Sequence, residues 1–566
     1  MRRMKGAAGL LTALLLAFQL SAQTFALASE DNGIEVVPVN FTHNGYSYEI
    51  EGVAKSTDGD YQIKSPARLA ARKLPSTYDP RSSGEITTVK DQASTGACWA
   101  FSALACAEQD LIKKGLENPS AEFSVPALVL SSNSGTATGK DDFSSGGNWL
   151  FAASALANGQ GLCYEDYEPF LESGTENMIV SENKKSVSEY RLNYVMELSS
   201  TTQVKRKIME LGAVSASYFA GNGYMNHNNT AYYDPDASKN TIINHSVTVV
   251  GWDDNYSKDN FRYKPANNGA WLVKGSWGAD QDNDGFYWVS YDEAEFGQFC
   301  CYDFEESCDN TYHYSKMTGY VVNASNDGSV YGANVFTAKA DEKLDKAGFM
   351  YVGKTGSADY TLSVYTDVSD SDPIGVLETQ ISGSVSANGF YTVDFPEDIL
   401  LEEGEKYSIS VKFSGDSGRG YLLAESDRTS KAQSGQSYIS LNGKYWSDVG
   451  ADKTDSIGSL FIYAYTDDTA KPDKSSLESA LAKYGTLAGC EREANNARTV
   501  LADETASKND ISNAQKLLIS AAEEHDEALV ITTEAQWESF ANRVSSGESF
   551  EGKLVTLEGC LLYTSP

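Results

Sequence analysis

One cysteine in this chain, Cys98, has the surroundings of a reactive thiol. It lies between a Gly-Ala pair and an apolar stretch with helical spacing, and Gln92 stands six residues before it. A thiol at a helix N-terminus meets the positive end of the helix dipole, which favours the thiolate, the form that attacks carbonyl carbons. A glutamine amide nearby can donate a hydrogen bond to a developing oxyanion. Cys98 and Gln92 are therefore predicted to carry nucleophilic chemistry on a carbonyl group.

The sequence around Cys98 resembles the nucleophile motif of papain-like cysteine proteases. That motif reads Cys-Gly-Ser/Ala-Cys-Trp/Tyr, and the run here is Thr95-Gly96-Ala97-Cys98-Trp99. Residues 74–81 and 89–92 are also similar to the start of the mature protease in that family. The resemblance implies that Cys98 attacks the scissile carbonyl and that Gln92, with the backbone N–H of Cys98, holds the oxyanion. It implies no metal and no organic cofactor.

A thiol nucleophile needs an imidazole to take and return the proton. Only two of the five histidines, His227 and His245, fall inside the candidate catalytic domain. His227 lies in a polar loop with no strand to hold it. His245 opens an alternating, strand-like segment, at a separation from Cys98 close to the one expected in the family. We therefore predict that His245 is the catalytic base.

The third catalytic residue of the family is missing. Its members carry Asn-Ser-Trp-Gly after the histidine, and the asparagine orients the imidazole ring. The run here is Lys274-Gly275-Ser276-Trp277-Gly278, so Gly275 offers no side chain while Trp277 keeps the place of the shielding tryptophan. The resemblance thus implies an active domain in which His245 is weakly oriented. On this basis Gly275→Asn is expected to raise turnover.

A glycine pair is the main candidate for a substrate cleft. Gly146, Gly147 and Asn148 open a second helical stretch, and they resemble the Gly-Gly segment that lines the family's cleft. Two glycines let a ligand approach the backbone closely, although a plain loop-to-helix turn would have the same sequence. Asn244, directly before His245, and Trp277 complete the predicted cleft.

Composition and charge restrict the partners. The chain has 79 acidic and 45 basic residues and a formal net charge of −34, which would repel nucleic acids and anionic membrane surfaces. Residues 1–28 combine a basic start, an apolar run and an Ala-Leu-Ala site, the order of a secretory signal. No later apolar run is long enough to span a bilayer. We predict a secreted or cell-surface protein that acts on proteins or peptides.

A chain of 566 residues is too long for one hydrophobic core. Position and composition predict, after the signal, five segments: a short pro-segment (29–73), a two-lobed α+β papain-like peptidase domain (74–305), an all-β sandwich (310–466), a small all-α helical module (475–528) and the start of a truncated further unit (530–566). The β-sandwich resembles the lectin-like domain of certain exported bacterial cysteine proteases. That likeness implies glycans or cell-surface components as partners.

The sequence contains only weak indications of disulfides or of a metal site. Thr95 stands where the family's first motif cysteine forms a disulfide, so that bridge is impossible here. Cys300, Cys301 and Cys308 are close enough for a local clip, with their partners left open. The segment 280–285 has the opening of a calcium loop but lacks the glutamate expected at its twelfth position. An acidic surface turn is the favoured interpretation, and no metal site is predicted.

Two other functions remain compatible with the sequence. A non-catalytic adhesin, in which a degenerate protease domain carries a glycan- or protein-binding β-sandwich, is supported by Gly275. Another thiol acyl transfer, such as transglutamination, would require an amine acceptor in preference to water. The protease-like lead-in and Gln92 argue against that reaction.

Overall fold

The computed structural model describes much of the chain. The described residues are 39–43, 46–51, 74–132, 143, 146–159, 162–165, 170, 189–221, 223–226, 228, 230–237, 243–279, 282–315, 321–369, 371–426, 432–451, 457–470, 472–487, 489–503, 506–527, 529–531 and 555–557. The predicted signal (1–28), His227 and most of the predicted terminal unit (530–566) lie outside these residues. Two compact units are formed, one by residues up to 180 together with 190–469 and one by 181–189 together with 470–566.

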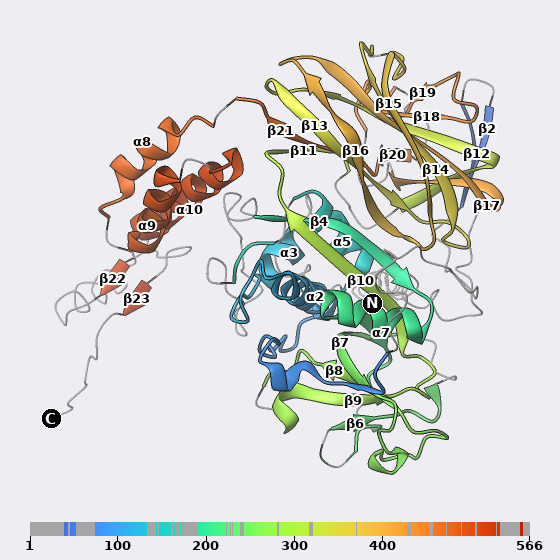
Figure 1. The fold of residues 1–566 in the computed structure, drawn as a ribbon, viewed down its shortest axis with the longest axis vertical. Helices are drawn as coiled ribbons and strands as arrows, with labels where there is room; N and C mark the ends of the chain where they lie inside the picture. The colour runs from blue at the N-terminus through green and yellow to red at the C-terminus, as the bar shows by residue number, and fades with distance from the viewer. Residues whose placement is uncertain are drawn as a thin grey trace, which may run out of the picture. The chain divides into compact units, whose positions relative to one another are not determined.

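The helical half of the first unit is built around one buried helix. Its helices are α2 (Cys98–Lys114), α3 (Val125–Ser132) and α5 (Trp149–Ala157). Helix α2 ends where Gly115 adopts the left-handed conformation, with two lysines in the last turn, as the helix dipole favours. Almost all of its length is buried, and it packs against strands β7 and β10 (Figure 1). The helix therefore begins at the candidate nucleophile.

The β half of this domain is a largely antiparallel sheet. Its elements are β3 (Thr77–Tyr78), β4 (Tyr190–Leu198), α7 (Thr201–Leu211), β5 (Val214–Tyr218), β6 (Ala231–Tyr232), β7 (His245–Asp253), β8 (Ala270–Lys274), β9 (Phe286–Ser290) and β10 (Gly297–Glu306), with 3-10 turns η1 (Pro80–Ser83), η4 (Lys258–Asn260) and η5 (Asp282–Gly285). The strands follow the order β4-β10-β5-β7-β8-β9-β6. Strands β7 and β8 are buried along nearly their whole length, so they fix the candidate site rigidly.

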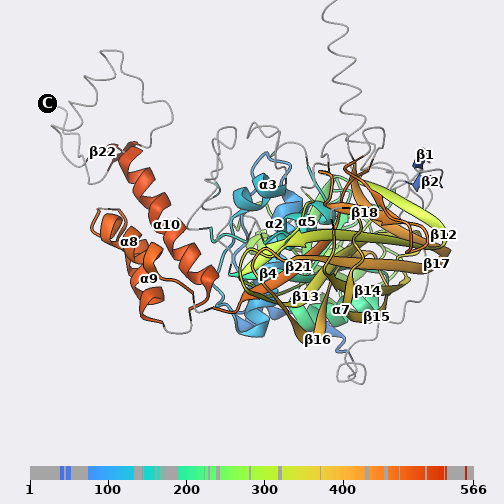
Figure 2. The ribbon, with the colours of Figure 1, turned by 90° about the horizontal axis from the view of Figure 1, so that it is seen from above.

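A β-rich domain follows, as the short β runs predicted. Its strands are β11 (Asn310–Tyr312), β12 (Val321–Thr337), β13 (Glu342–Tyr351), β14 (Ala358–Thr366), β15 (Val376–Val385), β16 (Gly389–Leu401), β17 (Lys406–Ser426), β18 (Ser437–Ser440), β19 (Ser447–Asp448), β20 (Ile457–Leu460) and β21 (Ile462–Asp468). They fall into two sheets, β12-β17-β14-β15 with its side strands and β11-β21-β13-β16, that share one hydrophobic core (Figure 2).

Part of the predicted pro-segment pairs with this β-rich domain. Strands β1 (Val39–His43) and β2 (Tyr46–Glu51) form a hairpin. Strand β2 lies antiparallel to β12, with Ile50 opposite Ala324. The hairpin therefore extends the sheet of the β-rich domain, an arrangement that no sequence pattern predicted.

One sheet runs through both domains of the first unit. Strand β16 pairs with β4, with Gly389 opposite Met196 and Tyr391 opposite Tyr194. A Cβ on Gly389 would lie 2.1 Å from the carbonyl oxygen of Val195, so only glycine permits this approach. Twelve strands are joined in this way. The two domains thus share backbone hydrogen bonds as well as side-chain packing.

The second unit contains three helices, α8 (Ser475–Tyr484), α9 (Glu491–Ala502) and α10 (Lys508–Glu527), around a small core rich in alanine and leucine. Strands β22 (Leu529–Ile531) and β23 (Val555–Leu557) pair in parallel after them. Among the described helices of the whole chain, none combines the length and apolar character needed to cross a membrane.

The local disulfide clip considered for Cys300, Cys301 and Cys308 does not form. All seven cysteines in the described part of the chain are free. Cys300 and Cys301 are neighbours on β10, so their side chains point to opposite faces of the sheet. They enter different hydrophobic cores accordingly.

Asn388 tests the contact between the domains. Its carbonyl accepts from the N–H of Glu197 at 2.9 Å, its Nδ2 donates to the Glu197 carboxylate at 3.1 Å, and its Oδ1 accepts from the N–H of Gly353 at 2.9 Å. Asn388→Ala leaves buried partners unpaired and should lower the free energy of unfolding by about 2 kcal/mol, measured by urea denaturation. The exposed control Asn255→Ala should change it by less than about 0.5 kcal/mol. Equal effects of the two variants would contradict this role.

Candidate active site

The predicted nucleophile and the predicted base open two elements that pack against each other, α2 and β7. Cys98 is the first residue of α2, and His245 is the first residue of β7. Ser246, which follows the histidine, hydrogen-bonds to the Cys98 thiol through both its backbone and its side chain. The Ser246 hydroxyl also lies 3.1 Å from that of Ser217. The structure therefore places Cys98 beside Ser246, the residue that follows His245 at the start of β7.

Gln92 is held in one orientation. Its backbone N–H donates to the carbonyl of Ser276 at 2.8 Å, and its side-chain Oε1 accepts from the Ser276 hydroxyl at 2.6 Å. Because Oε1 is occupied, Nε2 is the donor end of the amide, and one of its hydrogens binds the Thr95 carbonyl at 2.8 Å. The second N–H of this amide can therefore donate a hydrogen bond to an oxyanion. Sequence reasoning found Gln92 but missed Ser276.

His245 is buried and packed between aromatic rings. Only 5% of its surface is exposed. Its ring stacks on Trp277 with centroids 4.4 Å apart and planes 8° from parallel, and Tyr218 contacts it edge-on at 5.9 Å. Burial lowers the pKa of the His245 imidazole to about 4. Its Nε2 atom is buried and makes no hydrogen bond among the described residues.

Burial opposes the thiolate that the helix dipole would favour. It raises the pKa of Cys98, although hydrogen bonds from Ser246 and from the backbone of Trp99 act in the opposite direction. Burial also lowers the pKa of the His245 imidazole. In the unliganded site, burial therefore disfavours both the thiolate and the imidazolium.

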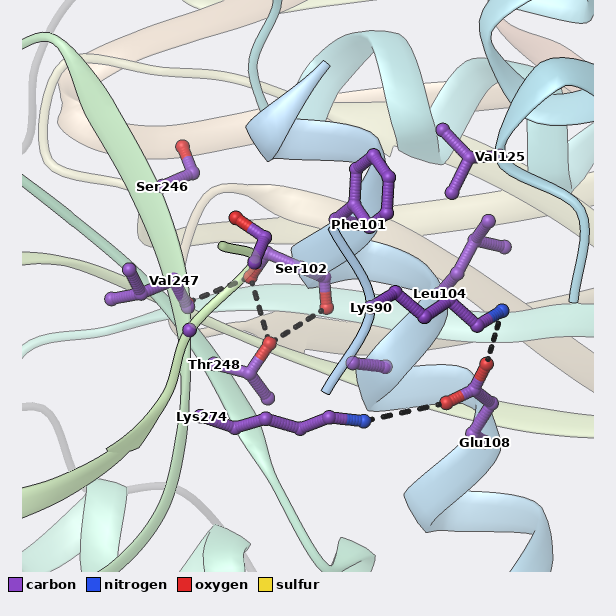
Figure 3. Close-up of a pocket in the computed structure, with 13 residues that line it drawn as sticks. Lys90, Phe101, Ser102, Leu104, Glu108, Val125, Ser246, Val247, Thr248 and Lys274 are labelled. Atoms are coloured by element: carbon purple, nitrogen blue, oxygen red, sulfur yellow. Dashed lines mark hydrogen bonds and ion pairs between the residues drawn. The ribbon is translucent and has the colours of Figure 1, made fainter. Parts of the chain in front are cut away.

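A buried carboxylate joins the three segments of the site. Glu108 on α2 lies 3.4 Å from Lys90 Nζ and 3.7 Å from Lys274 Nζ, and it accepts from the Thr87 hydroxyl at 2.7 Å. Figure 3 shows the carboxylate between the two ammonium groups. Although burial alone would raise the pKa of Glu108, the two lysines hold it below its usual value. The cluster stays charged and fixes the helix against β8.

A second contact fixes the helix against β7. The Ser102 hydroxyl donates to the carbonyl of Val247 at 2.7 Å, and the Thr248 hydroxyl lies 3.4 Å from Ser102 (Figure 3). A small cavity beside these residues has about 20 Å³ of space for water centres. That volume suits about one water molecule. The cavity also reaches Gly275 and Ser276.

Three of the predicted cleft residues, Gly146, Gly147 and Asn148, have structural roles in the fold. A Cβ on Gly147 would lie 2.5 Å from the indole of Trp99, so this glycine makes room for a side chain of the protein itself. Asn148 caps α5, since its Oδ1 accepts from the N–H groups of Leu150 and Phe151. Gly146 has a φ of 71°, the left-handed region that favours glycine. A role for these three residues in binding substrate remains a proposal.

Asn244 and Trp277 flank the base. The Oδ1 of Asn244 accepts from the N–H of Ala220 at 2.7 Å, and its Nδ2 donates to the carbonyl of the same residue at 3.2 Å. Asn244 thereby ties the chain after β5 to the start of β7. Trp277 is 37% exposed and covers one face of the His245 ring. It can therefore both shield the imidazole and meet a ligand.

No metal site emerges from the described residues. They contain no group of three or more His, Cys, Asp or Glu side chains placed to hold an ion. Of the segment considered for calcium, Asp280 and Gln281 lie outside the described residues, and Asp282–Gly285 forms the turn η5. The chemistry of Cys98 and His245 itself calls for no cofactor.

This fold and site define a class of thiol peptidase with an appended β-rich domain, and the comparisons agree. Residues 74–323 match the papain family cysteine protease, and residues 311–466 match the lectin like domain. The first region is therefore a papain-family cysteine protease domain, and the second is a lectin-like domain.

Among solved structures, the chain is similar to the cysteine protease Cwp84, a surface layer associated protein of Clostridium difficile. A structure of its protease and lectin-like domains is 26% identical with a TM-score of 0.61, covering 74% of this chain and 92% of that one. A second, solved after propeptide cleavage, is 28% identical with a TM-score of 0.61, covering 70% of this chain and all of that one.

Curated relatives include cathepsins. Human cathepsin L2 is 26% identical over 224 residues, which cover 39% of this chain and 62% of that protein. Mouse cathepsin K is 24% identical over 216 residues, which cover 38% of this chain and 59% of that protein. The chain thus spans about three fifths of the length of these relatives.

The Ser276 hydroxyl is expected to act only through Gln92. Gln92→Ala should lower kcat about 100-fold, the usual effect of losing an oxyanion donor. Ser276→Ala should lower kcat about threefold, because it frees the amide to rotate. In the Gln92→Ala background the serine substitution should have no further effect, measured with a fluorogenic peptide. Simple additivity of the two effects would contradict this coupling.

The raised pKa of Cys98 predicts a particular alkylation profile. The rate constant of Cys98 with iodoacetamide should rise toward alkaline pH, with no plateau between about pH 5 and 7, because thiolate forms only above the raised pKa of Cys98. Subtracting the rate of Cys98→Ala removes labelling of other cysteines. An acid plateau that His245→Gln abolishes would show a resting ion pair instead.

Proposed function

We propose that this chain is an exported cysteine endopeptidase. Cys98 attacks the scissile carbonyl as His245 accepts the thiol proton, and His245 then donates that proton to the leaving amine. Gln92 Nε2 and the backbone N–H of Cys98 bind the oxyanion. Water next attacks the acyl-enzyme, with His245 as base, and regenerates the thiol.

The observation that carries this proposal is the convergence of one short segment, Gln92 to Cys98, with two distant ones that contain His245 and Ser276. Cys98 begins α2, His245 begins the facing strand β7, and Gln92 is bound through Ser276 to the chain just after β8. A thiol, an imidazole and a fixed amide donor are the three groups that acyl transfer to water requires. Their common site argues for peptide hydrolysis more strongly than any one motif does.

The place of action and the partners follow by analogy. The sequence of residues 1–28 supports export, and Cwp84 is described as a surface layer associated protein. We therefore place this protein outside the cell, secreted or at the surface. The lectin-like domain supports binding to glycans or cell-surface components, which would hold the peptidase near protein substrates. Residues 29–73 lie between the predicted signal and the protease domain, and this position supports their assignment as a pro-segment.

A non-catalytic adhesin is the second candidate. Gly275 supports it, because Nε2 of His245 makes no hydrogen bond among the described residues. Burial also lowers the pKa of the imidazole to about 4, which makes it a weak base. Such a protein would keep the cleft and the lectin-like domain but would not turn over peptides.

Labelling and cleavage separate the two functions. An epoxide thiol probe should label Cys98, and the wild type should cleave a fluorogenic peptide, whereas Cys98→Ala should do neither. Cys308→Ala serves as the control, because Cys308 is the other described cysteine that is only partly buried. This variant should label and cleave as the wild type does. Absence of both labelling at Cys98 and cleavage would favour the adhesin.

A further inference from the structure

The space beside Gly275 is already occupied. Its φ lies outside the left-handed region, so the backbone would accept another residue. A Cβ there would lie 3.1 Å from the carbonyl oxygen of Gly285 and 3.3 Å from Cε1 of Tyr287. Both distances are tighter than ordinary van der Waals contact. A longer side chain would have to displace the tyrosine ring.

Tyr287 is tied across the sheet to the partner strand of His245. Its hydroxyl lies 2.9 Å from the hydroxyl of Tyr218, and both side chains are almost completely buried. Tyr218 stands directly opposite His245 in the pairing of β5 with β7. The hydroxyl pair therefore links β9 to β5 across β7, which begins at His245, and β8, which ends just before Gly275.

The aromatic rings surround the imidazole on two sides. Trp277 stacks on His245 and lies nearly parallel to Tyr287, with centroids 6.3 Å apart. Tyr218 meets the imidazole edge-on. This cage of rings fills the space around the imidazole and restricts how the imidazole can rotate. Aromatic packing can therefore orient the imidazole even though its Nε2 atom makes no hydrogen bond among the described residues.

We propose that Tyr287 replaces the side chain missing at Gly275 and, with Tyr218 and Trp277, positions His245 by aromatic packing. Tyr287 and Tyr218 are positioning residues, because they act through the imidazole. This inference rests on the proposed peptidase function and deepens it. It also reverses the expectation drawn from the sequence, since Gly275→Asn alone should lower turnover by displacing Tyr287.

The test is a double-substitution cycle with a fluorogenic peptide. Tyr287→Phe should lower kcat about twofold to tenfold with KM nearly unchanged, because the hydroxyl bond to Tyr218 is lost. Gly275→Asn alone should lower kcat. In the Tyr287→Ile background, however, Gly275→Asn should raise kcat roughly tenfold over Tyr287→Ile alone, since the amide gains space and can accept from Nε2.

Alkylation of Cys98 by iodoacetamide supplies a readout that needs no turnover. The half-maximal pH should fall by about one unit in Gly275→Asn/Tyr287→Ile relative to Tyr287→Ile, because an oriented imidazole stabilises the thiolate. If the wild type cleaves no peptide, the proposed function fails, and this shift still decides the positioning role. A merely structural role for Tyr287 would leave the alkylation profile unmoved.

Stability is monitored by thermal melting of each full-length variant. Tyr291→Phe is the matched control. Tyr291 lies just after β9, and the substitution removes the hydrogen bond of 2.9 Å that its hydroxyl donates to the Asp254 carboxylate. It should alter the melting temperature without changing kcat or the alkylation profile. The proposal is overturned if Gly275→Asn raises kcat equally with Tyr287 present and absent, or if Tyr287→Phe matches the wild type in both assays.

Discussion

The geometry of the site depends on one buried carboxylate, Glu108. It lies in the interior of α2, the helix that begins at Cys98, and both of its cationic partners adjoin other parts of the site. Lys90 stands two residues before Gln92, and Lys274 immediately precedes Gly275. Nucleophile, oxyanion donor and aromatic cage are thus anchored to the same charge. Removing the charge would leave the buried Lys274 ammonium without its carboxylate and Lys90 with only Glu122 and Glu165, which is destabilising.

The lectin-like domain is joined to the protease domain by strand pairing and by buried side chains. Its strand β16 continues the sheet of the protease domain through β4. Arg191 on β4 is buried, pairs with Glu305 and stacks on Tyr465 of the lectin-like domain at 4.2 Å. A flexible tether would allow the two domains to move apart. The pairing of β16 with β4 instead joins the lectin-like domain to the protease domain by backbone hydrogen bonds.

The sequence offered candidates for the reacting groups but did not predict most of the residues that hold them in place. Cys98, Gln92 and His245 could be found because local motifs and the small number of histidines identify them. Tyr218 and Tyr287 could not, since their pairing joins strands distant in sequence. The helix dipole argument predicted a thiolate, but burial has the larger effect on the pKa of Cys98. The glycine at 147 was assigned to substrate, whereas the Trp99 indole fills the space beside it.

The same contrast applies to the domains. Short β runs separated by turn residues predicted a β-rich domain, because such spacing is typical of strands joined by turns. The cross-domain pairing of β16 depends instead on Gly389, whose missing side chain lets two strands approach. No local pattern marks such a glycine. Neither does any local pattern predict the hairpin β1–β2 on β12.

The central claim is that Cys98 forms an acyl-enzyme with His245 as its base. Active-site titration with a peptidyl p-nitrophenyl ester tests this claim most directly. The account predicts a burst of about one equivalent of nitrophenol per chain in the wild type. The burst should be absent in Cys98→Ala and at least about 100-fold slower in His245→Gln. A wild type without a burst, or a burst that His245→Gln leaves unchanged, would contradict the account.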